Sequence, residues 1–206
     1  EDVAREVRID SFYEKPEISY TALENRLEDY MSGLGGLYGM YYYDIYSDTG
    51  FGINEDYVYT AASTVKIPLN LYLYEKFRDG SVSPDELMTY LSEDYEAGTG
   101  VIQYEETGRQ YTLRQLSTLS IVESDNIAAN MLLRRLGRKE LKEYMRGLGG
   151  IVVSDSENIS CPLDMALYML KTYEFCIENG DLGRELMNSY RTQGITTGYL
   201  RDFPKT

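Results

Sequence analysis

The chain has no histidine, no tryptophan and only two cysteines among its 206 residues. The lack of histidine excludes a Ser-His-Asp triad and any zinc site with histidine ligands. A cysteine nucleophile is also disfavoured, because neither thiol has a histidine to activate it. If the protein is a serine hydrolase, a lysine must therefore act as the base.

The two cysteines flank a helix that the sequence predicts from Pro162 to Asn179. At about 1.5 Å per helical residue, Cys161 and Cys176 are then roughly 22 Å apart, which is far beyond the reach of a disulfide. Two free thiols are expected.

Long apolar runs and positive charge are also scarce. No stretch of about 18 apolar residues is present, so no membrane span is predicted. The formal net charge of −14 disfavours nucleic acid, which is bound through Lys and Arg contacts to phosphate. The hydrophobic fraction of 43% is ordinary for a globular protein and allows one domain, or two lobes that share a core. The 21 tyrosines fit half-buried core and rim positions better than a carbohydrate or peptide platform.

Hydrophobic periodicity and turn residues predict an α+β protein with a helical lobe after a β-hairpin. The hairpin is expected from two strands on either side of the turn Ser47–Gly50, with the first strand over Leu37–Ile45. A small ribbon is expected between Val101–Tyr104 and Gln110–Thr112. Helices are expected from Ser19 or Thr21 to Met31, from Ser63 to Asp79, from a start at Ser83–Glu86, from Thr112 to Val122, from Ser124 to Leu136, from Arg138 to Leu148, from Pro162 to Asn179 and from Leu182 to Arg191.

Ser63 and Lys66 form the most informative pair in the chain. Their spacing places a hydroxyl and an amine on one helix face, close enough to hydrogen-bond. The helix N-terminus favours developing negative charge, and burial disfavours the ammonium form of Lys66, so Lys66 is a plausible base for Ser63. Alone, a Ser-x-x-Lys pattern is weak, and the alternative is a capping serine beside a solvated lysine.

A second motif, Ser124-Asp125-Asn126, makes the catalytic interpretation of Ser63 and Lys66 stronger than the capping alternative. Together the two motifs resemble the penicillin-recognising serine hydrolases, most closely the class A β-lactamase-like group. The stretch Ile121–Asn130 is similar to the setting of the second motif in that group, and Phe51–Asp56 and Tyr59–Ser63 extend the likeness. The resemblance runs from about Leu37 to Thr206. It implies residues 20–206 as a catalytic domain, with 1–19 as an N-terminal extension.

The resemblance also implies roles for the second motif. Ser124 relays a proton between Lys66 and the leaving nitrogen, Asn126 hydrogen-bonds the amide side chain of the substrate, and Asp125 braces the loop. An N-cap cluster is the alternative interpretation, and it is compatible with catalysis. Asn70, one turn after Lys66 and polar in an apolar run, is expected either to orient Lys66 or to be a satisfied core amide.

The sequence departs from the class A pattern in two places. The short segment between Gly149 and Pro162 lacks the Glu-Pro-x-Leu-Asn motif whose glutamate activates the deacylating water in that family, and Glu157 is the nearby candidate to replace it. The third family motif, Lys-Thr/Ser-Gly, is not found; Lys205-Thr206 directly follows Phe203-Pro204 and is not assigned to it. The antiparallel sheet is therefore expected to be incomplete in this chain, with C-terminal strands and a helix missing from these 206 residues.

These patterns predict a serine hydrolase, without metal or cofactor, that forms an acyl-enzyme with a β-lactam or a related cell-wall peptide amide. The alternatives are a D-alanyl-D-alanine peptidase or esterase, and a β-lactam-binding sensor that does not turn over. The expected partner is a small β-lactam or peptidoglycan-like peptide, not a nucleic acid. The resemblance implies an exported, cell-envelope or extracellular protein.

Overall fold

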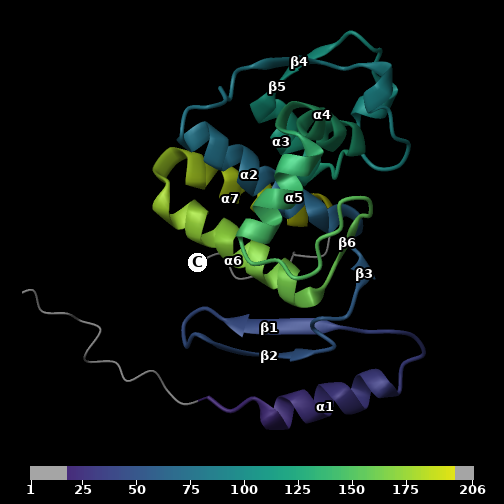
Figure 1. Ribbon diagram of the computed structural model, residues 1–206, viewed down its shortest axis with the longest axis vertical. Coiled ribbons are helices and arrows are strands. Elements are labelled where there is room, and N and C mark those ends of the chain that lie inside the picture. Colours follow the sequence, from purple (N-terminus) through teal and green to yellow (C-terminus); the bar gives the residue numbers. More distant parts are fainter. Residues whose placement is uncertain (1–17, 198–206) are drawn as a thin grey trace, which may run out of the picture. The chain divides into compact units, whose positions relative to one another are not determined.

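A computed structural model describes residues 18–197, and it describes the side chains as far as residue 192 (Figure 1). The chain divides into two compact units, Glu1–Glu55 and Asp56–Thr206. Lys205 and Thr206 lie outside the described residues. No helix in the described part is long and apolar enough to cross a membrane.

The first unit contains helix α1 (Thr21–Ser32) and a hairpin of β1 (Met40–Asp44) and β2 (Thr49–Ile53). The strands pair antiparallel from Met40 opposite Ile53 to Asp44 opposite Thr49, which confirms the predicted hairpin. Aromatic rings of Tyr20, Tyr42 and Phe51 pack together, with centroids 5.3 to 5.7 Å apart. The sequence also predicts Ser19 or Thr21 as the cap of α1, and this is wrong, because the N-cap is Tyr20 and no side chain caps the helix.

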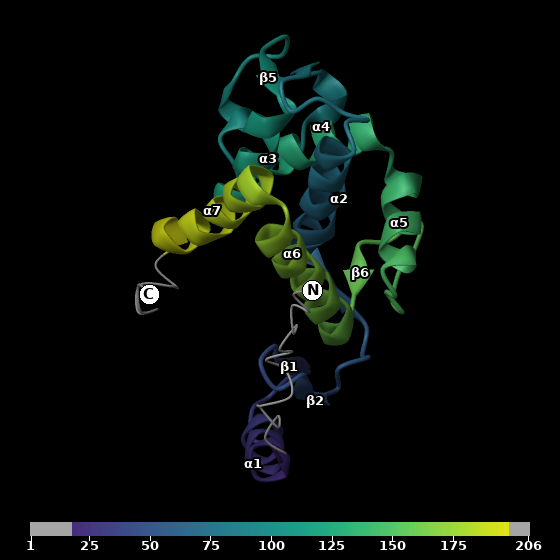
Figure 2. The same cartoon turned by 90° about the vertical axis from the view of Figure 1, so that its left-hand side faces the viewer.

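The second unit is a helical bundle around α2 (Lys66–Arg78). Eight of the thirteen residues of α2 are buried, and this helix contacts every other helix of the unit. Figure 2 shows α2 between α5 on one side and α6 and α7 on the other. The surrounding helices are α3 (Leu113–Val122), α4 (Asn126–Leu136), α5 (Arg138–Gly147), α6 (Pro162–Glu178) and α7 (Gly180–Thr197).

Two short antiparallel pairs complete the second unit. Strand β3 (Tyr59–Thr60) pairs with β6 (Ile159–Ser160), and β4 (Leu87–Thr89) pairs with β5 (Gln110–Thr112). The first pair brings the segment after α5 beside the chain that leads to Ser63. Small antiparallel sheets among many helices match the predicted α+β class.

Two local predictions are wrong, and distant partners explain both. The predicted helix at Ser83–Glu86 is a turn before β4, because the carbonyls of Pro84 and Glu86 accept hydrogen bonds from the first N–H groups of α3. The predicted strand Val101–Tyr104 contains a 3₁₀ turn, Ile102–Tyr104. The N–H groups of Val101 and Ile102 are bound by a buried carboxylate, so they are not available to a ribbon.

Both cysteines are buried and free, as predicted. The types and spacing of Thr112 and Gln115 predict a capping box at the start of α3, and it is confirmed, since each side chain binds the main-chain N–H of the other residue.

Candidate active site

Ser63 lies in a 3₁₀ turn, Ala62–Val65, that leads directly into α2. The predicted helix therefore begins as an α-helix only at Lys66, one turn after Ser63. Ala62 has a φ of 47°, in the left-handed region that costs a non-glycine residue about 1–2 kcal/mol. The Asn158 side chain and carbonyl hold this turn, through bonds with the Ala62 carbonyl (3.0 Å) and the Ala61 N–H (2.9 Å). The bond from Asn158 lets the structure retain a strained backbone beside Ser63.

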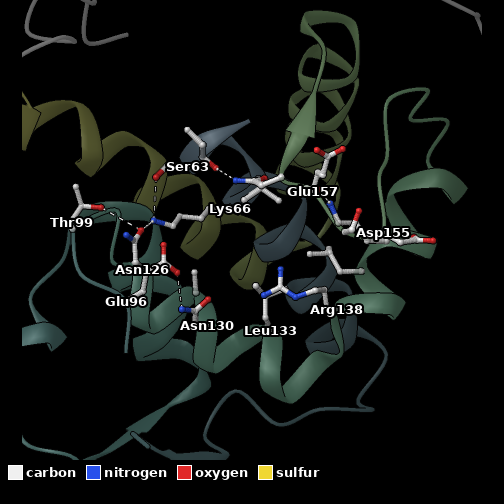
Figure 3. A pocket seen from close by; sticks show the side chains of 18 residues that line it. Ser63, Lys66, Glu96, Thr99, Asn126, Asn130, Leu133, Arg138, Asp155 and Glu157 are labelled. Atoms are coloured by element: carbon white, nitrogen blue, oxygen red, sulfur yellow. Dashed lines mark hydrogen bonds between the residues drawn. The ribbon is translucent and has the colours of Figure 1, made fainter. Parts of the chain in front are cut away.

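Lys66 is the centre of the hydrogen-bond network. Its Nζ lies within hydrogen-bond distance of four acceptors, Ser63 Oγ (3.3 Å), Ser124 Oγ (3.2 Å), Asn126 Oδ1 (2.9 Å) and the Ser124 carbonyl. Ser124 Oγ donates to Ser63 Oγ at 2.9 Å. The two hydroxyls and the amine thus form a closed triangle in which each group contacts the other two. Figure 3 shows Ser63, Lys66 and Asn126 side by side.

The environment of Lys66 shifts its titration toward the neutral form. The residue is only 7% exposed, and burial lowers the pKa of its ammonium below the usual value, against the opposing effects of the Asp125 and Glu96 carboxylates. A neutral amine can accept a proton, whereas an ammonium cannot. Ser63 is exposed, so the nucleophile is open to solvent while its base is shielded.

Asp125 fixes the loop that presents Ser124. Its fully buried carboxylate accepts hydrogen bonds from the N–H groups of Val101 (2.7 Å) and Ile102 (2.8 Å) with one oxygen, and from Ala128 (2.9 Å) with the other. The last of these bonds caps α4. The carboxylate therefore ties the segment before the 3₁₀ turn to the start of α4, as a bracing residue should.

Ser124 itself has a φ of 50°, which is a second strained position at the site. Its carbonyl accepts from Thr99 Oγ1 at 2.7 Å, and the Asn126 N–H donates to the Thr99 carbonyl at 3.2 Å. In the sequence Thr99 lies in a glycine-containing loop, Glu96–Gly100, and no pattern there predicts a role for it. The neighbouring Gly100 is required there, because its φ is +113° and a Cβ would lie 2.3 Å from the Asp125 carboxyl carbon.

Asn70 is fully buried and does not contact the Lys66 amine. Its amide donates to the Lys66 carbonyl (2.8 Å) and to Ser120 Oγ (2.9 Å), and its oxygen accepts from Ser117 Oγ at 2.7 Å. Asn70 is thus a satisfied core amide that joins α2 to α3. Any orienting effect on Lys66 acts through the helix backbone.

A cavity of about 510 Å³ opens beside Ser63, Lys66 and Asn126. In Figure 3 the side chains of Arg138, Asp155 and Glu157 lie to the right of Ser63 and Lys66. Ser124 does not line this cavity; it lines a smaller hollow of about 190 Å³ together with Ser63, Met169 and Tyr190. The two hollows share Ser63 and Lys66, so a substrate could extend from the nucleophile in two directions.

Three carboxylates line the larger cavity, from Glu96, Asp155 and Glu157. Glu96 accepts a hydrogen bond from the Asn130 amide at 2.9 Å and is close enough to Lys66 to affect its pKa. Glu157 is exposed, and its carbonyl rather than its carboxylate accepts from Lys142, at 3.2 Å. Sequence reasoning singled out Glu157 and missed Glu96, because only the fold brings the loop before Gly98 to the site.

The described side chains contain no group of three or more Cys, Asp or Glu residues that could hold a metal ion. The site brings together an exposed hydroxyl, a shielded amine and a second hydroxyl that contacts both. Such a set can transfer a proton from a nucleophile to a leaving group.

Comparisons with known proteins identify the family and the fold. A family model described as "Beta-lactamase enzyme family" matches residues 22–206. A mutant of PBP-A, solved as an acyl-enzyme complex with penicillin G, is 27% identical, with a TM-score of 0.78 over 86% of this chain and 71% of the other. A β-lactamase from Sphaerobacter thermophilus is 23% identical, with a TM-score of 0.71 over 85% of this chain and 71% of the other. No curated protein sequence matches the chain.

Proposed function

This chain belongs to the beta-lactamase enzyme family, and from that premise we propose that Ser63 forms an acyl-enzyme with a β-lactam or a related cell-wall peptide amide. The observation that carries the proposal is the triangle of Ser63, Lys66 and Ser124, with hydroxyl and amine atoms 2.9 to 3.3 Å apart. A penicillin adduct of PBP-A, at 27% identity, supports the same class of substrate.

In the proposed reaction, neutral Lys66 takes the proton from Ser63 Oγ as that oxygen attacks the carbonyl carbon of the substrate. The carbonyl oxygen becomes an oxyanion, and the Ser63 N–H at the start of the helical segment is a donor placed to stabilise it. The proton then passes from Lys66 through Ser124 Oγ to the amide nitrogen. The C–N bond breaks, and the acyl group remains on Ser63 as an ester.

Asn126 and Asp125 support this reaction in different ways. Asn126 already accepts a hydrogen bond from Lys66 and lines the larger cavity, where its amide could bind the amide of the acyl group. Asp125 keeps Ser124 in place and has no contact with the cavity. We propose that it is a positioning residue.

Hydrolysis of the ester is proposed to be slow. The glutamate motif of class A enzymes is absent, and the exposed Glu157 carboxylate has no hydrogen bond or ion pair to a described residue. A water molecule without a positioned base loses general-base assistance, which is typically worth about 10²–10⁴-fold. This observation favours the second candidate, a D-alanyl-D-alanine peptidase, esterase or β-lactam sensor that penicillin traps. The peptide amides of this class are cell-wall components, so we propose an exported or cell-envelope protein.

The proposal is tested by intact mass spectrometry after mixing the protein with benzylpenicillin. We expect one added penicilloyl group per chain, and we expect the adduct to persist for minutes or longer. In a separate experiment without penicillin, the protein is given a peptide that ends in D-alanyl-D-alanine, or a thioester analogue of that peptide. Hydrolysis of either compound indicates a peptidase or esterase, whereas an adduct with penicillin and no hydrolysis of these compounds indicates a sensor. No adduct and no hydrolysis of any of these compounds would contradict the proposal.

A further inference from the structure

The larger cavity continues past the nucleophile to two cations on α5. Arg138 and Lys142 line it together with Ser63 and Asn126. Lys142 is one helical turn after Arg138, so the two side chains lie on the same face of α5. Neither residue has a part in the reaction proposed above.

Lys142 is an unusual residue for a cavity wall. It is only 5% exposed, and its single hydrogen bond goes to the Glu157 carbonyl at 3.2 Å, although an ammonium has three N–H donors. No carboxylate lies within ion-pair distance of Lys142 or Arg138 among the described side chains. A buried cation is normally paired, because an unpaired one is costly.

The charged groups that act on Lys142 are two arginines and one aspartate. Burial, and after it the charges of Arg138 and Arg146 on α5, lower the pKa of Lys142, and Asp155 from the segment after α5 opposes them. Asp155 is already paired with Arg146, at 2.5 Å. The Glu157 carboxylate lines the same cavity without hydrogen-bonding Lys142. At this end of the cavity neither Arg138 nor Lys142 has an acidic partner among the described side chains, and an anion bound beside them would raise the pKa of Lys142 and favour its charged form.

We propose that Arg138 and Lys142 bind a carboxylate on the acyl part of the substrate. The proposal rests on the function proposed above and narrows its substrate class to acyl donors with a negatively charged side chain. A carboxylate fits better than a phosphate, because Asp155 and Glu157 on the same wall would repel a more highly charged anion.

The two hollows indicate which part of the substrate carries this charge. Ser124, which is proposed to protonate the leaving nitrogen, lines only the smaller hollow. Asn126, Arg138 and Lys142 line only the larger one. The leaving group is therefore expected toward Ser124, and the acyl side chain toward Lys142.

The test uses cephalosporins whose 7-amino group carries a succinyl, glutaryl or adipoyl chain. Each compound is compared with its terminal carboxamide, which has nearly the same size and no charge. The second-order rate constant of Ser63 acylation is measured for each compound by intact mass spectrometry. The rate constant for the carboxylate is then divided by the rate constant for its carboxamide. We expect a ratio of about ten or more for at least one chain length, since a hydrogen bond to a charged group is stronger than one to a neutral group.

The variants Lys142→Met and Arg138→Gln should each bring this ratio toward one. Lys139→Met is the matched control, because Lys139 is on the same helix, is largely exposed and pairs with Glu143 outside the cavity. Its ratio should equal that of the wild type. Arg138 is exposed, so Arg138→Gln is expected to fold even if the buried Lys142→Met variant does not.

The outcomes separate this inference from the function on which it rests. Acylation by the carboxamides with no preference for the carboxylates at any length would overturn the anion site and leave the acyl-enzyme intact. A preference that survives in Arg138→Gln and Lys142→Met would show that other residues recognise the charge. No acylation by either member of any pair would overturn both proposals.

Discussion

Replacing Asp125 by alanine should destabilise the protein more than any exposed acidic substitution. The wild-type carboxylate is fully buried and accepts three main-chain hydrogen bonds, from Val101, Ile102 and Ala128. Each buried N–H left without an acceptor costs about 1–3 kcal/mol. Val101 is exposed, so its N–H can bind water instead, and the loss expected from the N–H groups of Ile102 and Ala128 is about 4 kcal/mol. For a domain of this size, 1 kcal/mol corresponds to about 2–4 °C in Tm, so Tm should fall by about 12 °C.

Asp125→Asn gives a graded version of the same change. An asparagine can keep its oxygen toward Val101 and Ile102, which places its amide nitrogen against the N–H of Ala128. Only one of the three bonds is then lost, and the expected cost is about 2 kcal/mol, or about 6 °C. Asp85→Ala is the matched control, because Asp85 is exposed and its side chain has no hydrogen bond or ion pair among the described residues.

Thermal melts followed by circular dichroism provide the measurement. The order of Tm should be wild type and Asp85→Ala, then Asp125→Asn, then Asp125→Ala. Gly100→Ala should also melt early, because its new Cβ would collide with Asp125. A Tm for Asp125→Ala within about 3 °C of the wild type would refute the claim that this carboxylate braces the loop of Ser124.

Three further predictions concern titrating groups. If neutral Lys66 is the base, the acylation rate should rise with pH through the lowered pKa of Lys66 and level off above it; Lys66→Ala should lower the plateau by about 10²–10⁴-fold, and an unchanged rate would remove Lys66 from the mechanism. Whatever deacylation occurs should slow in Glu96→Gln and not in Glu157→Gln, since only the Glu96 carboxylate is oriented by a neighbour, the Asn130 amide, and could position a water molecule; the reverse order, read from the decay of the adduct mass, would contradict this assignment. Cys161 and Cys176 should react with a thiol reagent at pH 8 only on unfolding, because burial raises the pKa of both thiols, to about 11 for Cys176; rapid labelling of the native protein would contradict their buried, protonated state.

The core of the candidate site could be predicted from the sequence, because the groups that interact there are close to each other in the chain. Ser63 and Lys66 are one helical turn apart, and Asp125 is an N-cap whose residue type and position predict its hydrogen bond to α4. Joining the two motifs required the family resemblance, because periodicity alone does not show that Ser124 lies beside Lys66. The capping box of Thr112 and Gln115 could also be predicted from the sequence, because both residues are in the same turn.

The rest depends on contacts between distant segments. The turn at Ser83–Glu86 looks helical until α3 supplies donors to its carbonyls. Strands of two residues, such as β3 and β6, are too short to produce a periodic pattern. Lys142 reads as an ordinary surface position of an amphipathic helix, and only the return of the chain at Glu157 buries it. Glu96 reads as a loop residue for the same reason.

The central claim is that Ser63 is the nucleophile. It is tested most directly by digesting the protein after reaction with a penicillin and mapping the modified peptide by tandem mass spectrometry, for the wild type and for Ser63→Ala. The account predicts a penicilloyl group on Ser63 in the wild type and no modification in Ser63→Ala. A penicilloyl group on any other residue of the wild type, or one that persists in Ser63→Ala, would contradict it.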